Sequence, residues 1–151
     1  DMPARSGISS RKIGRSQLIF VVAPQHPLAA YAGPVPSGEL RRHRAIVIAD
    51  TSQELTARTV GLLEGQDSLR VPDMQSKAKA QIAGLGIGSL PRWLAEPEIA
   101  AGRLLPLELA EPRPALDLSI AWRNRQVGKG LSWFLETLEE KDVTETLIRG
   151  I

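Results

Sequence analysis

Residues Ile82 to Leu94 read IAGLGIGSLPRWL, with glycine at every second position from 84 to 88 and a proline at 91. Each glycine costs backbone entropy and packs no side chain, so the run needs a structural reason. Just before it, Met74, Ala78 and Ile82 recur at four-residue spacing, which predicts an amphipathic helix over 74–83 with Lys77, Lys79 and Gln81 outside the apolar stripe. Gly84 therefore follows a helix, where a left-handed C-cap favours glycine.

The segment after Gly84 predicts a short strand over 85–90, in which Gly86 and Gly88 lie on the same face. That face has no side chains, so another backbone, a helix or a ligand can come close. Pro91 suits the first turn of a second helix, and Gly102 suits its end.

Working outward, two apolar runs at 18–23 and 45–49 predict strands that are covered on both faces, as in α/β sheets. Further strands are predicted at 69–71, 103–107 and 116–122. A stripe of Leu131, Phe134, Leu135 and Leu138 predicts a C-terminal amphipathic helix. Residues 1–16 are rich in Ser, Arg, Lys and Gly and predict a loop or a frayed arm. Strands that alternate with helices make an α/β sheet the expected class.

The composition is that of an ordinary soluble domain. The 151 residues are 42% hydrophobic and 24% charged with a net charge of +2, which gives no concentrated basic face for nucleic acid. The absence of cysteine excludes disulfides and thiolate chemistry, and with only two histidines we assign no metal and no cofactor. No run of about 20 apolar residues and no signal segment is present, so we expect a cytoplasmic location and no membrane partner.

Sequence motifs for catalysis are weak. Ser76 and Lys79 match the serine-lysine pattern S-x-x-K, but Ser9 and Lys12 match it too, and the companion S-D-N and K-T-G elements are missing. We interpret Ser76 as a helix-start residue and Lys79 as solvated. A dinucleotide fingerprint fails because Ser89 stands where a third glycine is needed. No catalytic residue is assigned, and we expect no enzyme.

Two polar segments have a place suited to binding. In open α/β sheets, ligands collect at the carboxyl ends of strands beside helix N-termini, whose free N–H groups attract carboxylates. The first candidate segment follows strand 45–49, and the second begins the helix at 74. The residues are Asp50, Thr51 and Ser52 in the first, and Met74, Gln75 and Ser76 in the second. Plain helix capping also explains each segment alone, so a site requires both to face one cleft.

Two motifs, in order, carry a resemblance to a known family. Residues 24–29, PQHPLA, follow the first predicted strand, and 83–93, AGLGIGSLPRW, follow the helix. HPLA after a strand, then a helix and GxGxxxLP, is similar to the effector-binding region of LysR-type transcriptional regulators. The spacing of the closing strand and helix, near 116–140, matches as well.

This resemblance implies a type 2 periplasmic-binding-protein fold, with two Rossmann-like subdomains, two crossover strands and a small-molecule cleft. Laid onto the chain, 1–23 would be the end of subdomain I and the first crossover strand. Residues 24–117 would be a complete subdomain II. Residues 118–151 would be the return crossover strand and C-terminal helix of a partial subdomain I.

The resemblance also implies a function. The domain would sense a small, anionic metabolite through the six polar-segment residues, with Gly84, Gly86 and Gly88 at the cleft wall. DNA would be bound only through an N-terminal helix-turn-helix outside this chain, and the protein would be a homodimer or homotetramer. The alternative is a solute-binding protein of a transport system with the same fold, which would need an export signal.

Overall fold

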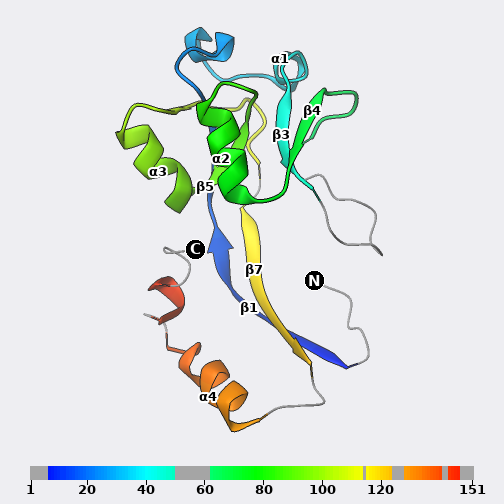
Figure 1. Cartoon of the computed structure of the whole chain (residues 1–151), viewed down its shortest axis with the longest axis vertical. Coiled ribbons are helices and arrows are strands. Elements are labelled where there is room, and N and C mark those ends of the chain that lie inside the picture. Colours follow the sequence, from blue (N-terminus) through cyan, green and yellow to red (C-terminus); the bar gives the residue numbers. More distant parts are fainter. Residues whose placement is uncertain (1–6, 50–61, 114, 124–127, 141–142, 147–151) are drawn as a thin grey trace. The chain divides into compact units, whose positions relative to one another are not determined.

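The structure is a computed structural model that describes residues 7–49, 62–113, 115–123, 128–140 and 143–146. Contacts group the chain into two compact units, one of Asp1–Gln17 with Ala115–Ile151 (unit 1) and one of Leu18–Pro114 (unit 2). Strands and helices alternate along the chain, which confirms the mixed α/β class (Figure 1). The strands are β1 (Ile8–Ser16), β2 (Leu18–Val22), β3 (Ala45–Ile48), β4 (Ser68–Val71), β5 (Gly88–Pro91), β6 (Leu105–Pro106) and β7 (Leu116–Arg123). The helices are the 3-10 turn η1 (Pro27–Ala30), α1 (Ser37–Leu40), α2 (Met74–Ile82), α3 (Arg92–Ala100) and α4 (Lys129–Thr137).

Unit 2 is built on two short sheets joined by a bridge. Strands β3 and β4 pair in parallel, whereas β2 pairs antiparallel with both β5 and β6. Ala45 of β3 bridges to Ile87, just before β5, in parallel. There the Ile46 N–H donates to the Ile87 carbonyl at 2.9 Å, and the Ile87 N–H donates to the Arg44 carbonyl at 2.8 Å. The two sheets therefore form one surface that helices can cover.

The core of unit 2 lies on both faces of this surface, because successive residues of a strand point to opposite sides. Phe20 and Val22 of β2 belong to one buried cluster, and Val21 belongs to the other. The second cluster includes Ala78 of α2 and Ala95 of α3, so these helices cover the same face (Figure 1). The continuous apolar run of β2 is thus explained by burial on both sides.

The glycine run combines a helix cap with close backbone packing. Gly84 has φ +73° and ends α2, and the Leu85 N–H donates to the Ala80 carbonyl at 3.0 Å, as in a Schellman motif. The predicted C-cap is therefore confirmed. A Cβ added to Gly86 would lie 2.5 Å from the Arg44 carbonyl oxygen, so its missing side chain lets two backbone segments meet. The strand itself begins at Gly88, later than predicted, because Leu85 completes the cap and Ile87 pairs with β3 instead.

Other predicted elements are present with shifted ends. Pro91 is the N-cap of α3 rather than part of its first turn, and Gly102, with φ +70°, follows its last turn as predicted. Strand β6 keeps only two of the residues predicted for it, Leu105 and Pro106, which pair with β2. These differences reflect pairing partners, which local patterns do not contain.

Unit 1 contains a long antiparallel pair that the sequence did not predict. Strand β1 pairs with β7 from Ile8↔Arg123 to Ser16↔Leu116, so the prediction of a loop over 1–16 is wrong for residues 8–16. The segment is polar because alternate residues face solvent, and its partner lies about a hundred residues away. Asp117 accepts from Lys12 at 2.6 Å and from Arg15 at 3.0 Å across the pair, which matches charges between the strands.

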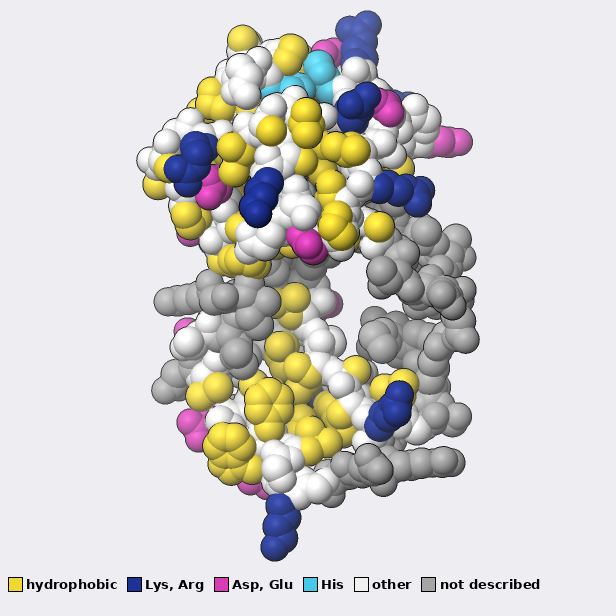
Figure 2. All heavy atoms as spheres, in the orientation of Figure 1, with side chains coloured by type: hydrophobic (Ala, Val, Ile, Leu, Met, Phe, Trp, Pro, Cys, Tyr) yellow, Lys and Arg dark blue, Asp and Glu magenta, His cyan; other side chains and the backbone are white. Residues whose placement is uncertain are grey.

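Helix α4 carries the predicted stripe but buries only part of it. Of the stripe, Leu138, just after the helix, is buried, whereas Phe134 is 45% exposed. Trp133, which lies outside the stripe, is 65% exposed. Figure 2 shows hydrophobic side chains gathered over the region of α4. Periodicity alone thus predicted the helix but did not predict how much of its apolar face is covered.

Gln66 holds the turn before β4 against α1, and we expect Gln66→Ala to destabilise the protein by about 2 kcal/mol. Its Nε2 donates to the carbonyls of Leu40 (2.8 Å) and His43 (2.9 Å), and its Oε1 accepts from the Leu63 N–H at 3.1 Å. The side chain is buried, so its loss leaves these groups unpaired. Urea denaturation measures the change. Gln17→Ala, at an exposed position, is the control, and equal midpoints for the two variants would contradict the prediction.

Candidate functional site

The N-terminus of α2 presents the second predicted polar segment. Gln75 is exposed, while Met74 and Ser76 are half-buried. Asp73 caps the helix, and its carboxylate accepts from the Ser76 N–H at 2.7 Å. This hydrogen bond, made to the charged form, lowers the pKa of Asp73 below its ordinary value. One N–H of the first turn is therefore already bound by an anion of the chain itself.

The first predicted segment, Asp50, Thr51 and Ser52, lies outside the described residues. The strand that leads to this segment, β3, is among the described residues. Strands β3 and β4 run in parallel with Ile48 opposite Val71, and the Ala49 N–H donates to the Val71 carbonyl at 2.8 Å. The chain therefore leaves β3 toward Asp50 at the same sheet edge from which it leaves β4 toward α2.

We expect Asp73→Asn to lower the melting temperature only slightly at neutral pH, since asparagine is also a good N-cap, and Asp73→Ala to lower it more. Because the pKa of Asp73 is lower in the folded than in the unfolded protein, its charge stabilises the fold above the unfolded pKa, and the effect is lost as pH falls through the folded pKa. Melting curves of both variants between neutral and acid pH test this. A deficit of Asp73→Ala that stays constant down to the most acid pH would contradict the charge contribution.

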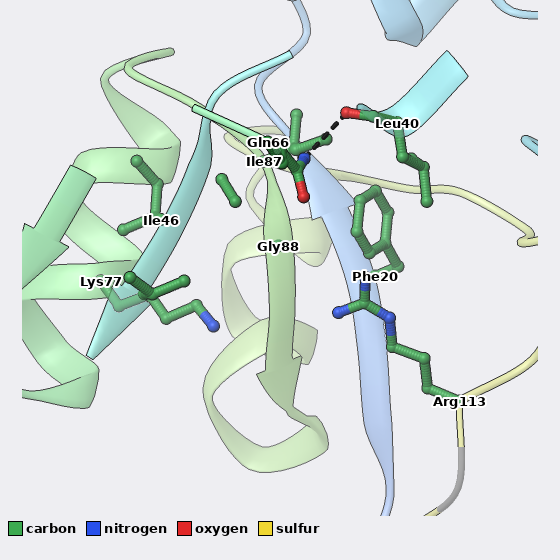
Figure 3. A pocket seen from close by; sticks show the side chains of 10 residues that line it. Phe20, Leu40, Ile46, Gln66, Lys77, Ile87, Gly88 and Arg113 are labelled. Carbon is green, nitrogen blue, oxygen red and sulfur yellow. Dashed lines mark hydrogen bonds between the residues drawn. The ribbon is translucent and has the colours of Figure 1, made fainter. Parts of the chain in front are cut away.

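A small cavity lies between β3 and β5, within unit 2 (Figure 3). The bridge at Ala45 and Ile87 is the only pairing between these strands in the described chain, and Figure 3 shows the strands diverging beyond it. The cavity holds about 10 Å³, close to the space of one water molecule. Its lining is Phe20, Leu40, Ala45, Ile46, Val47, Gln66, Lys77, Ile87, Gly88 and Arg113.

Two cations meet at this cavity. Lys77 of α2 is only 7% exposed, and the guanidinium of Arg113 lies 5.6 Å from the centre of the Phe20 ring. In Figure 3 the two charged ends point toward the same space from opposite sides. Burial, and secondly repulsion from Arg113, lowers the pKa of Lys77 to about 8, and burial also lowers the pKa of Arg113. Among the described residues, no Asp or Glu lines the cavity and neither cation makes an ion pair.

Gln81 lies one turn after Lys77 on α2 and is fully buried. Neither its Oε1 nor its Nε2 has a hydrogen-bond partner in the described structure. Both side chains reach Gly88, where an added Cβ would lie 2.8 Å from the Gln81 Nε2 and 3.2 Å from the Lys77 Cε. Gly88 therefore makes the room that these two polar side chains occupy.

The sequence places Lys77 and Gln81 outside the apolar stripe. Both residues are nevertheless buried. Met74, Ala78 and Ile82 do pack on the second core cluster as predicted, and Lys79 is exposed as predicted. Lys77 and Gln81 form a second buried line at four-residue spacing. The signal was the bare glycine face, which predicted that another backbone, a helix or a ligand comes close, without saying which side chains fill the space. Nothing in the sequence marked Arg113, which comes from a loop.

The three glycines have separate places. Gly84 caps α2, Gly86 contacts the Arg44 backbone, and Gly88 lines the cavity. The prediction that all three form the wall of an effector cleft stays a prediction.

Within the described ranges, no group of three or more His, Cys, Asp and Glu side chains could hold a metal ion. A search of the same residues finds no helix both long and apolar enough to span a bilayer.

Comparisons with known proteins match most of the chain to one family. The model of the LysR substrate binding domain matches residues 1–142. The probable HTH-type transcriptional regulator YhaJ of Escherichia coli (strain K12) is 37% identical over 142 residues, which cover 91% of this chain and 47% of that protein. The chain thus spans about half the length of the curated relatives it matches.

Solved structures agree on the fold. The regulatory domain of MetR, a LysR family regulator from N. meningitidis, has a TM-score of 0.68 at 18% identity, covering 95% of this chain and 68% of that one. The effector binding domain of QuiR, solved with shikimate, has a TM-score of 0.66 at 18% identity, covering 91% and 66%. The predicted type 2 periplasmic-binding-protein-like fold is confirmed. Because the family model matches most of the chain, the chain belongs to the LysR substrate binding domain family.

Proposed function

We propose that this chain is the effector-sensing part of a LysR-type transcriptional regulator that acts in the cytoplasm. The observation that carries the proposal is the family match over residues 1–142, together with relatives that are transcriptional regulators. DNA would be contacted by a helix-turn-helix region outside this chain. Effector binding would shift the arrangement of subdomains or subunits, in a homodimer or homotetramer, and thereby change DNA contacts.

We place the effector at the shared carboxyl edge of β3 and β4. Asp50, Thr51 and Ser52 would approach it from one strand, and Met74, Gln75 and Ser76 from the start of α2. The hydrogen bond from the Ala49 N–H to the Val71 carbonyl supports this, because it holds the carboxyl ends of β3 and β4 side by side. Residues 24–117 would act as subdomain II, with its crossover strands on either side.

The effector class we propose is a small anion, most simply an organic acid. QuiR, a structural neighbour, was solved with shikimate, which is a carboxylate. The start of α2 offers N–H groups to an anion, although Asp73 already takes that of Ser76. Neutral polar side chains at 51, 52, 75 and 76 would then orient the rest of the ligand.

A thermal-shift screen tests the proposal. We expect one organic acid to stabilise the chain, since a ligand at 100 times its dissociation constant adds about 2.7 kcal/mol, and its uncharged amide to do so less. Gln75→Ala and Thr51→Ala should reduce the shift, whereas Ser10→Ala, exposed on β1, should not. A shift of equal size in all three variants would contradict the site. In the full-length protein, the same acid should change affinity for operator DNA.

Regulation is favoured over the alternatives. The relatives are HTH-type transcriptional regulators, which gives the transport hypothesis no support. For the serine-lysine pattern, Lys79 is exposed and Ser76 lies at the capped start of α2. Loss of ester hydrolysis in Ser76→Ala would be needed to revive catalysis.

A further inference from the structure

The cavity between β3 and β5 has an unbalanced charge. Lys77 is buried as a residue, with 7% of its surface exposed, and the Arg113 guanidinium faces its ammonium across the same space. Removing a cation from water is costly unless an anion or several acceptors replace the water. Among the residues described, no carboxylate provides this, and the two cations repel each other.

We propose that this cavity is an anion-binding site in which Lys77 and Arg113 hold one carboxylate group of a small ligand. This site does not depend on the strand-end effector site, since its lining includes none of residues 74–76. It would require only that unit 2 is folded.

The donors of the cavity favour a carboxylate. The enclosed space admits about one water molecule, so one carboxylate oxygen would enter between the two cations while the rest of the ligand stays outside. Arg113 offers a planar pair of N–H donors that fits two carboxylate oxygens, and Lys77 adds a point charge with up to three donors. The Phe20 ring under the guanidinium favours its present orientation.

Gln81 adds a second buried polar group beside the cavity. Its side-chain amide is fully buried without a partner among the described residues, next to Gly88 on the cavity wall. Buried amides in native proteins are nearly always hydrogen-bonded, to protein or to ordered water. Its Nε2 would support the site from the α2 side, either directly or through a water molecule.

The test uses the 151-residue chain with sodium acetate as the probe and acetamide as the uncharged analogue, at constant ionic strength. Two-dimensional NMR follows the backbone amides of Ile87 and Gly88 and the titration of the Lys77 amine. We expect acetate, and not acetamide, to shift both amides saturably and to raise the pKa of Lys77. A purely structural lysine would show no acetate-dependent change of this kind.

Matched variants assign the binding to the two cations. Lys77→Met and Arg113→Met should weaken acetate binding at least about tenfold, each by removing one of the two charges. The controls Lys79→Met and Arg70→Met remove exposed cations from α2 and β4, and they should bind acetate as the unmodified chain does. Lys77→Met retains the apolar stem, so it also keeps the fold.

Three results would overturn the proposal. These are equal shifts with acetate and acetamide, equal acetate affinity in Lys77→Met and Lys79→Met, or no saturable shift of Gly88 at all. Binding of inorganic phosphate without binding of acetate would overturn the carboxylate assignment. Failure of the strand-end site would be recognised separately, because Gln75→Ala changes no group that lines this cavity.

Discussion

Lys77→Met is expected to raise the free energy of unfolding at pH 7 by up to about 3 kcal/mol. Burial lowers the pKa of Lys77 from 10.5 to about 8, so the folded state holds its charge at a cost that the unfolded state does not have. At 1.36 kcal/mol per pH unit, that difference amounts to about 3 kcal/mol. Methionine fills the space of the stem without a charge. Urea denaturation in the absence of added carboxylates measures the gain.

The sign of the effect also fixes its pH dependence. Between about pH 8 and 10.5 the unfolded protein binds a proton at Lys77 that the folded protein has lost, so the stability of the unmodified chain rises with pH through this window. The advantage of Lys77→Met should therefore shrink above pH 8. Lys79→Met, at an exposed position on the same helix, is the control and should show no such trend. A Lys77→Met variant less stable than the unmodified chain at pH 7 would refute the argument.

Gly86→Ala is expected to destabilise the protein by about 3 kcal/mol, at the upper end of the usual cost of overpacking. The added Cβ would lie 2.5 Å from the Arg44 carbonyl oxygen and 2.7 Å from the Ile46 Cδ1. A backbone oxygen cannot turn away as a side chain can. The clash would therefore push apart the bridge that joins the two sheets of unit 2. Chemical denaturation gives the magnitude.

Gly38→Ala provides the matched comparison. It lies in the same unit, and no atom within 4 Å would contact its added Cβ, so we expect little change or slight stabilisation. If the Gly86→Ala and Gly38→Ala variants unfold at the same denaturant concentration, close backbone packing is not the reason for the glycine at position 86. Gly88→Ala should fall between them, since its closest neighbour is the amide end of Gln81, although the Ile46 carbonyl also lies within 3.3 Å.

Local patterns predicted an element correctly where its signal lay within a few neighbouring residues. The spacing of Met74, Ala78 and Ile82 gave α2, and the position of Gly84 after it gave the left-handed cap. The loop predicted over 1–16 failed at β1, because a polar strand is recognisable only by its partner. The binding residues were predicted from strand ends, and three of those six lie among the described residues.

The cavity shows why the rest could not be predicted. Lys77 has the same side chain as Lys79, two positions away on the same helix, yet one is buried and the other exposed. Which of them enters the core depends on where Gly88 leaves space, and on a loop residue, Arg113, that arrives from elsewhere in the chain. The two positive charges face each other because distant segments pack together, and no single segment predicts this arrangement.

By itself, the sequence determined the α/β class, the order of most elements, the glycine cap and, through two short motifs, the family. These follow from backbone conformation and side-chain periodicity, which act over a few residues. Only the tertiary structure decided that β1 pairs with β7, that Gly86 meets the Arg44 carbonyl, and that two cations share one cavity. Those outcomes depend on contacts between distant segments, where burial and the loss of water set the energy of a charge.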